Sequence, residues 1–316
     1  MRARGPLSVG CRLKGLTAPL LAVLALVFAL GVAAGLAPRV SQEAVWELRR
    51  TTEPRRTGIF RNPSLVESSG VAASRRWPGM LWTLNDSRHG AWIFATDTLG
   101  RDHGAFSVSG AENHDWEAIA LGPCGGGDCL YIADTGDNAR SRRSATIYRV
   151  PEPAIPAGAS RTRAAVALEF RYPRGSPDVE AAFVDPAGSV YLITKSQGRP
   201  PVVYRIRADA WGTGRTATAE QVGTLPIDSN SLGSRVTDAA LSPSGRVVAV
   251  RTYLAIYLFV LTADGSLAPT GVACDAAGLQ LQGEGISWLD ERLLVLTSEG
   301  GFGTRGTVVV LECGRG

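Results

Sequence analysis

The sequence has few of the residues that carry the familiar kinds of catalysis. Its 316 residues include three histidines, His89, His103 and His114, and no two of them stand at the spacing of a metal-ligand pair. No serine occupies the sharp strand-to-helix turn of a nucleophile elbow, and no glycine motif that cradles phosphate is present. Each histidine falls in an expected loop, so we expect solvated side chains there rather than a general base.

The chain also lacks a strong net charge. The formal charge is +4, and four basic residues, Arg2, Arg4, Arg12 and Lys14, precede the first apolar run. The remainder is close to neutral, which gives no indication of nucleic-acid binding. Aromatic residues make up only 7%, but 45% of the chain is hydrophobic, enough for one large globular domain or two ordinary ones.

One long apolar run, residues 16–36, follows the basic stretch and contains no charge. This is the layout of a secretory signal, and the small residues at 32–35 offer a cleavage site. The run is also long enough to span a hydrocarbon layer of ~30 Å. We therefore expect residues 1–40 to be a signal peptide or a membrane-anchor helix, residues 41–56 a linker, and the rest an extracytoplasmic protein. The membrane would be contacted only through the N-terminal segment.

Five cysteines are present. Cys11 precedes the apolar run, which leaves Cys124, Cys129, Cys274 and Cys313 in an oxidising compartment. Cys124 and Cys129 flank a glycine-rich turn that could bring them together across a hairpin, and we predict a disulfide there. A zinc site would need a closer pair and more ligands. Cys274 and Cys313 are then the two cysteines left over, and their pairing with each other follows only from that.

A repeat appears when segments that begin with an acidic or hydroxyl residue and continue into an apolar strand are aligned. The expected first strands begin at Ser69, Glu117, Glu180, Asp238 and Glu284. Second strands follow at 81–84, 130–133, 190–193, 247–250 and 293–296, and third strands at 91–94, 146–149, 202–205, 256–259 and 307–310. Turn residues at 186–188 and 243–245 are typical of tight hairpins.

The fifth repeat ends after its third strand, near Cys313, so its fourth strand has to come from elsewhere. Residues 58–60, just before the first repeat, are the natural donor. Closure by the N-terminus removes the open edge of a ring of sheets. We therefore predict that residues 57–316 form an all-β, five-bladed β-propeller, at 52 residues per blade. An irregular β-sandwich accounts less well for five aligned copies.

In a propeller the first strand of each blade lines the central channel, so the residues that open these strands gather at one mouth. Carboxylates so placed repel, since two like charges 4 Å apart cost about 4 kcal/mol at an effective dielectric of ~20. Oxygen ligands without histidine or cysteine select a hard cation, and export favours Ca²⁺ over Mg²⁺. The predicted metal ligands are Ser69, Glu117, Glu180, Asp238 and Glu284.

Two alternatives to a bound metal stay open for this ring. Lys195 and Arg251, at the ends of second strands, could neutralise it as ion pairs, or the carboxylates could share protons and have raised pKa values. Two residues before three ring members stand Glu67, Asp115 and Asp178, which form a second partial layer on the same side of their strands.

Polar residues of both charges end the second strands around the expected mouth. Asp134, Lys195 and Arg251 are the candidate catalytic residues. Lys195 and Arg251 could bind a small anionic substrate anchored by the cation, whereas Asp134 with Glu180 could be the acid and base of a glycosidase. Asp86 and Asp134 could equally cap turns.

Several segments resemble a known group of proteins. They are 81–87 (LWTLNDS), 112–120 (ENHDWEAIA), 131–138 (YIADTGDN), 178–181 (DVEA) and the Thr194-Lys195 pair. They look like exported bacterial propeller proteins with no assigned activity. This resemblance implies the fold and the export, and implies no reaction.

A narrower resemblance concerns the ring alone. It is similar to the ring of the calcium-activated apyrases, five-bladed nucleoside-diphosphate hydrolases whose central calcium is held by Ser, Glu, Glu, Ser and Glu. The resemblance implies that Ser69, Glu117, Glu180 and Glu284 are ligands, and Asp238 as well, although Asp238 departs from the family's Ser. Residues matching the apyrase nucleotide site outside the ring are not found.

The sequence thus predicts two functions of different classes. The first is a calcium-dependent hydrolase of a phosphoester or another small anionic substrate at the channel mouth. The second is a non-catalytic propeller with structural calcium that binds a ligand or a cell-envelope protein.

Overall fold

The computed structural model describes residues 46–49, 52–155, 160–195, 198–301 and 303–313. The signal or anchor helix expected within residues 1–40 lies outside the described residues. Within the described part of the chain, no helix is both long and apolar enough to cross a membrane.

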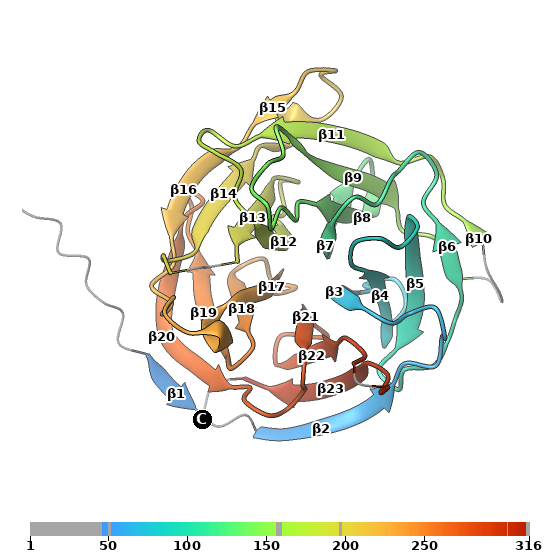
Figure 1. The fold of residues 1–316 in the computed structure, drawn as a ribbon, viewed down its shortest axis with the longest axis vertical. Coiled ribbons are helices and arrows are strands. Elements are labelled where there is room, and N and C mark those ends of the chain that lie inside the picture. The colour runs from blue at the N-terminus through green and yellow to red at the C-terminus, as the bar shows by residue number, and fades with distance from the viewer. Residues whose placement is uncertain (1–45, 50–51, 156–159, 196–197, 302, 314–316) are drawn as a thin grey trace, which may run out of the picture. The chain divides into compact units, whose positions relative to one another are not determined.

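The propeller unit consists of five sheets arranged around a central channel (Figure 1). Blade 1 contains β3 (Ser68–Ala73), β4 (Met80–Asn85), β5 (Trp92–Asp97) and β6 (Ala105–Ser107). Blade 2 contains β7 (Trp116–Cys124), β8 (Gly127–Asp134), β9 (Ala145–Pro151) and β11 (Val166–Arg171). Blade 3 contains β12 (Val179–Val184), β13 (Val190–Thr194), β14 (Val202–Ile206) and β16 (Glu220–Thr224). Blade 4 contains β17 (Val236–Leu241), β18 (Val247–Thr252), β19 (Ala255–Leu261) and β20 (Leu267–Asp275).

Blade 5 contains β21 (Gly283–Trp288), β22 (Leu293–Ser298), β23 (Thr307–Glu312) and, from the N-terminal side, β2 (Thr52–Ile59). Short strands extend three blades: β1 (Glu47–Arg49) pairs with β20, β10 (Ser160–Arg161) with β6, and β15 (Ala217–Thr218) with β11. Two 3₁₀ turns, η1 (Ala208–Ala210) and η2 (Leu232–Ser234), lie in loops. The predicted all-β, five-bladed propeller is therefore confirmed.

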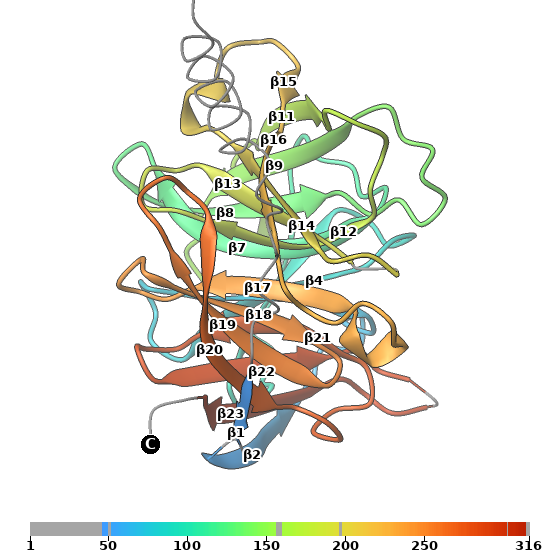
Figure 2. The ribbon, with the colours of Figure 1, turned by 90° about the vertical axis from the view of Figure 1, so that its left-hand side faces the viewer.

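Closure of the ring comes from the N-terminal side, as the repeat pattern predicts. β2 pairs antiparallel with β23 and places Ile59 opposite Thr307 (Figures 1 and 2). The strand is longer than the expected donor at 58–60, and it begins within residues 41–56, the segment expected to be a linker. Gly58 is required here, because a Cβ atom would stand 2.2 Å from the main-chain carbon of Leu99.

The first strands β3, β7, β12, β17 and β21 surround the channel, and each contacts the first strands of both neighbouring blades. The predicted hairpin turns are present between first and second strands. In one of them Gly188 has a φ of +88°, a left-handed conformation that favours glycine, and its amide donates to the Asp185 carbonyl at 2.9 Å. These turns return each chain segment so that the start of a first strand and the end of the second lie at the same face.

Apolar side chains fill the spaces between adjacent blades. Trp82 and Phe106 of blade 1 share one buried cluster with Trp116, Leu130 and Tyr148 of blade 2. Burying a side chain such as Phe106 stabilises the fold by roughly 1.5–3 kcal/mol. Because this packing fixes one blade against the next, residues far apart in sequence are held at constant positions around the channel.

The predicted disulfide Cys124–Cys129 is present, and the two remaining cysteines, Cys274 and Cys313, are also paired. Cys124–Cys129 closes the glycine-rich hairpin of blade 2, and Cys274–Cys313 connects β20 of blade 4 to the segment that follows β23 of blade 5. Two disulfides in one domain indicate an oxidising, extracytoplasmic compartment.

The two disulfides are expected to differ in their effect on stability. Cys274–Cys313 spans 39 positions and Cys124–Cys129 spans 5, so the former restricts the unfolded chain more. Loop-closure entropy gives a difference of about 2 kcal/mol. Urea unfolding of the Cys274→Ser/Cys313→Ser and Cys124→Ser/Cys129→Ser double variants measures it, and equal losses in the two variants would contradict this account.

Candidate metal centre at the channel mouth

Glu117 is the second residue of β7, and its carboxylate is buried at the channel mouth, where only 3% of the residue is exposed. Carboxylate oxygens of Glu117, Asp86 and Asp115 lie within 4.8 Å of one another. A second group on the other side consists of Glu117, Asp178 and Glu180, also within 4.8 Å. Glu117 therefore belongs to two acidic groups, one with blade 1 and one with blade 3.

Main-chain hydrogen bonds hold the group of Asp86, Asp115 and Glu117 in place. Asp86 directly follows β4, and its amide donates to the Glu67 carbonyl at 3.1 Å. The amides of Thr135 and Gly136, which follow β8, both donate to the Asp115 carbonyl at 3.1 Å. The three carboxylates thus come from positions fixed by blades 1 and 2.

Gly136 lies directly against two of these carboxylates. A Cβ atom on Gly136 would stand 2.3 Å from Glu117 Oε1 and 2.4 Å from Asp115 Oδ2. Real Cβ atoms do not approach oxygen so closely, so any side chain here would displace the carboxylates. The absence of a side chain is what lets both acids lie beside the main chain at this position.

The group on the other side is partly neutralised by a lysine. Lys195 follows β13, and its Nζ lies 2.6 Å from Glu180 Oε1 and 3.9 Å from Asp178 Oδ2. These carboxylates raise the pKa of Lys195 despite its burial. The ion-pair alternative for the ring therefore holds for Glu180 and Lys195.

No equivalent cation serves the group of Asp86, Asp115 and Glu117. Among the described residues, no lysine or arginine lies within ion-pair distance of these three carboxylates. Burial, then Glu180, Asp86 and Asp115, raise the pKa of Glu117 well above its usual range. Burial and the charges of Asp86 and Asp178 raise the pKa of Asp115 to about 6. A cation placed between these oxygens would relieve the repulsion.

The five predicted ring residues do not converge on a single point. The Ser69 hydroxyl donates to the main-chain carbonyl of Glu117 at 3.0 Å and lies 3.2 Å from its Oε2. Asp238 accepts hydrogen bonds from the amides of Ala239, at 2.8 Å, and Ile286, at 2.9 Å, so its carboxylate connects blades 4 and 5. The Asp238 carboxylate is fully buried among main-chain amides of the first strands.

Glu284 is also engaged within the protein. Its Oε1 accepts a hydrogen bond from the Tyr253 hydroxyl at 3.0 Å, and burial raises its pKa. Of the predicted ring, the structure brings together Ser69, Glu117 and Glu180. Asp238 and Glu284 belong to neither acidic group.

The expectation that Arg251 faces a ligand differs from the structure. Its side chain is fully buried, and Nη1 donates to the carbonyls of Gly285, at 2.7 Å, and Thr297, at 2.8 Å. Nη2 donates to Gln280 Oε1 at 2.8 Å. Gly283 makes room for the guanidinium, since a Cβ there would stand 1.8 Å from Nη2. Arg251 therefore ties blade 4 to blade 5 from within the protein.

Asp134, the other candidate catalytic residue, is fully buried at the end of β8. Its Oδ1 accepts from Arg142 Nη1 at 2.8 Å, and its Oδ2 lies 3.2 Å from His114 Nδ1. The amide of Asp115 also donates to Oδ1, at 3.2 Å. Both oxygens of Asp134 thus have partners within the protein, and Asp134 holds the main chain of Asp115 in place.

Sequence reasoning missed two features of this mouth. Asp86 was expected among the polar residues that end the second strands, with turn capping as an equal alternative, and it was not counted among the metal ligands. His89 was expected to be solvated, but its Nε2 lies 2.8 Å from Glu67 Oε2. Glu67, Asp86 and His89 are joined through the β4–β5 loop and the Asp86 amide.

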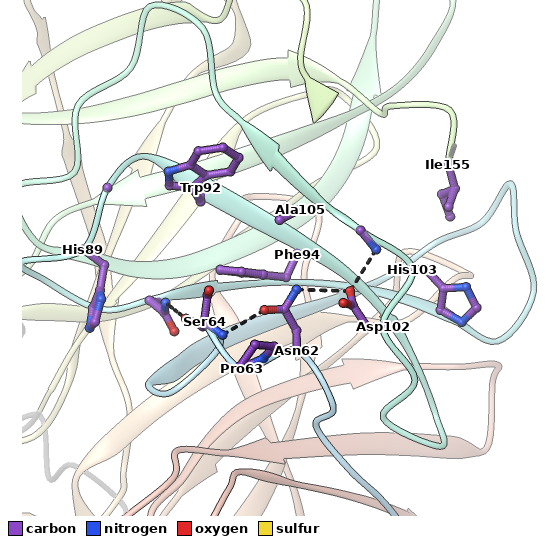
Figure 3. Close-up of a pocket in the computed structure, with 13 residues that line it drawn as sticks. Asn62, Pro63, Ser64, His89, Trp92, Phe94, Asp102, His103, Ala105 and Ile155 are labelled. Carbon is purple, nitrogen blue, oxygen red and sulfur yellow. Dashed lines mark hydrogen bonds between the residues drawn. The ribbon is translucent and has the colours of Figure 1, made fainter. Parts of the chain in front are cut away.

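His89 also lines a separate cavity of about 880 Å³ beside blade 1 (Figure 3). Trp92 and Phe94 of β5 form one side, and Asn62 faces them near Asp102, to which its Nδ2 donates at 3.1 Å. None of the predicted metal ligands lines this cavity. This cavity is separate from the acidic mouth. The Glu67–His89 pair links the two, because His89 lines the cavity and the Glu67 carbonyl accepts the Asp86 amide.

The metal-free protein should become less stable as the pH rises from about 4 to 8. Burial, then Glu284 and Asp86, raise the pKa of Glu299 to about 8, and burial raises that of Asp115 to about 6. An acid with a raised native pKa stabilises the fold when protonated, and this contribution is lost as it ionises. Urea midpoints in chelator should therefore be lower at pH 8 than at pH 5, and the Glu299→Gln variant should show a smaller difference. A higher urea midpoint at pH 8 than at pH 5 would contradict the raised pKa values of Glu299 and Asp115.

No protein-family model and no curated protein sequence matches the chain. Solved structures that are similar to it include the PQQ-bound aldose sugar dehydrogenase of Streptomyces coelicolor, with 14% identity and a TM-score of 0.47 over 84% of this chain and 97% of that one. The calcium-binding protein regucalcin of Agrobacterium tumefaciens has 14% identity and a TM-score of 0.45, over 81% and 94%. A gluconolactonase of Xanthomonas campestris has 13% identity and a TM-score of 0.46, over 79% and 86%. With identities and TM-scores this low, these similarities carry no argument about the activity of this chain.

Proposed function

We propose that this chain is an exported propeller that binds Ca²⁺ at its channel mouth and hydrolyses a small anionic substrate there. The observation that carries the proposal is the group of Asp86, Asp115 and Glu117, three carboxylates within 4.8 Å of one another. Among the described residues, no lysine or arginine pairs with them. The proposed ligands thus differ from the five-residue ring expected from the sequence and retain Glu117.

The donor set fits calcium. All three side chains offer oxygen, and Ca²⁺ takes 6–8 oxygen ligands in flexible geometry, so water or substrate would supply the remainder. Asp86 and Asp115 are partly exposed, which leaves the outer side of the group open to solvent. Gly136 supports the fit, because its missing side chain leaves room for the carboxylates of Glu117 and Asp115.

A hydrolytic role follows from this open side. Bound calcium would polarise an oxygen of the substrate and offset its negative charge. His89, oriented by Glu67, lies in the same β4–β5 loop as Asp86 and can accept a proton from an attacking water. Lys195 is paired with Glu180, so this acid does not repel an anionic substrate as an isolated carboxylate would.

A second candidate function is a non-catalytic binding propeller with structural calcium. It is favoured by the internal engagement of Asp134 and Arg251, two of the three residues expected to act on a substrate. The partner would be a small ligand or a cell-envelope protein. Turnover distinguishes the two functions, whereas calcium binding is common to both.

Calcium should raise the melting temperature of the chain, and this shift should depend on the acidic mouth. Ligand at 100 times its Kd stabilises by about 2.7 kcal/mol. Gly136→Ala and Asp115→Asn should lose the shift, because the first displaces two carboxylates and the second removes one. Gly127→Ala is the matched control, since nothing lies within 4 Å of its added Cβ. If calcium raised the melting temperature of both mouth variants as much as that of the wild-type chain, the proposed site would be wrong.

Hydrolysis should be calcium-dependent and should require His89. Screening of phosphoesters, nucleotides and lactones with calcium or chelator measures turnover directly. His89→Gln should lower kcat and leave the calcium-induced thermal shift unchanged. His103→Gln is the control, because His103 pairs with Asp97 at 2.9 Å, an acid that belongs to neither acidic group. If no substrate is turned over while calcium still binds, the non-catalytic function is the correct one.

A further inference from the structure

The cavity of about 880 Å³ beside blade 1 is lined by no member of either acidic group (Figure 3). We call it the side cavity. One wall is formed by β5, where Trp92 and Phe94 lie two residues apart and therefore on the same face of the strand. Asn62 and Ser64, from the segment that joins β2 to β3, form the opposite wall. The side cavity thus combines aromatic and polar walls, as small-molecule sites do.

The wall formed by β5 is held in place by packing and by the main chain. Phe94 is buried and shares one cluster with Val295 and Val308 of blade 5. The Trp92 amide donates to the Gly90 carbonyl at 2.8 Å. The Trp92 indole lies against Gly90, where a Cβ atom would stand 2.9 Å from the indole Cδ1. The main chain around Gly90 therefore positions the indole ring.

Trp92 is 39% exposed, although a tryptophan side chain carries a large apolar surface. Its indole N–H is a hydrogen-bond donor, and among the described residues it has no acceptor. Trp92 therefore presents two features to a ligand in the side cavity. One is an apolar ring face, and the other is a free donor.

Asp102 supplies an acceptor to the same cavity. Its Oδ1 accepts from Asn62 Nδ2 at 3.1 Å and from the Gly104 amide at 3.0 Å, and Asn62 Oδ1 accepts from the Ser64 amide at 2.9 Å. These bonds orient the carboxylate, and its Oδ2 has no partner among the described residues. No lysine or arginine of the described chain lines the side cavity, so the cavity offers no counter-charge to an anion.

We infer that the side cavity binds a saccharide, with one face of a sugar ring on Trp92 and hydroxyl groups at Asp102 and Ser64. A sugar ring has C–H groups on its faces and hydroxyls at its edge, and each hydroxyl both donates and accepts. The polar atoms left open in the cavity are of both kinds, because Asp102 Oδ2 accepts and the indole N–H donates. An organic cation could also lie over an indole beside a carboxylate, but it would leave the N–H donor unused. This site is additional to the proposed calcium site and does not depend on it.

The test is titration calorimetry of the purified chain with cellobiose, maltose, lactose and di-N-acetylchitobiose as probes. At least one of these disaccharides should bind the wild-type chain, and equally well in calcium and in chelator. Trp92→Ala should weaken that binding by roughly tenfold or more, because the apolar contact with the sugar ring is lost. Trp77→Ala is the matched control and should bind as the wild-type chain does, since Trp77 is 37% exposed and lies outside the side cavity.

Asp102→Asn tests the polar contact. This change keeps the size of the side chain and an oxygen for the Asn62 and Gly104 donors, but it replaces the open acceptor by a donor. Binding should fall by roughly tenfold, because a charge-assisted hydrogen bond is lost. An unchanged melting temperature in each variant shows that the loss is not one of folding.

Three results would overturn the inference. They are no binding of any of the disaccharides to the wild-type chain, equal losses in Trp92→Ala and Trp77→Ala, and unchanged binding in both Trp92→Ala and Asp102→Asn. Binding of choline in place of the disaccharides, lost in Trp92→Ala, would identify an organic-cation site and would overturn it as well. Sedimentation of the chain with insoluble peptidoglycan, dependent on Trp92, would support the inference and identify the saccharide as part of a polymer, whereas binding of the soluble disaccharides alone would support it with a free sugar as the ligand.

Discussion

The buried carboxylate of Glu117 is the constraint on which the channel mouth depends. It lies between the carboxylates of Asp86 and Asp115 on one side and those of Asp178 and Glu180 on the other. A buried charge costs free energy unless it is paired or hydrogen-bonded. Lys195 forms an ion pair with Glu180, whereas among the described residues no lysine or arginine lies within ion-pair distance of Asp115, which only the more distant charge of Arg142 favours. On this account the proposed calcium lies among the carboxylates of Asp86, Asp115 and Glu117, which come from blades 1 and 2.

The fold supplies this arrangement through contacts between blades. Ser69 joins blade 1 to Glu117 of blade 2, and Asp238 and Arg251 join blade 4 to blade 5. The pairing of β2 with β23 and the Cys274–Cys313 disulfide close the ring where the two ends of the domain meet. The same polar residue types therefore serve two purposes: those in blades 4 and 5 hold the propeller together, and those near blade 2 remain available for a cation.

The fold could be predicted from sequence because each blade repeats an acidic or hydroxyl residue, an apolar strand and a tight turn, and strand order follows from that repeat. The metal site could not be predicted as well. A position in the repeat places Asp238 at a strand start, but it does not show that its carboxylate turns to the Ile286 amide. Asp86 lies in a loop, and the repeat aligns only the strands, so it does not predict where a loop side chain points. Glu117 and Glu180 were found because their side chains do point into the mouth.

The calcium site can be tested most directly in a crystal of the chain grown with calcium, by its anomalous scattering. The account predicts one peak bonded to carboxylate oxygens of Asp86, Asp115 and Glu117 at about 2.3–2.6 Å, with further oxygen ligands from solvent. A peak on the channel axis bonded to Asp238 and Glu284, or no peak beside Glu117 at saturating calcium, would contradict it.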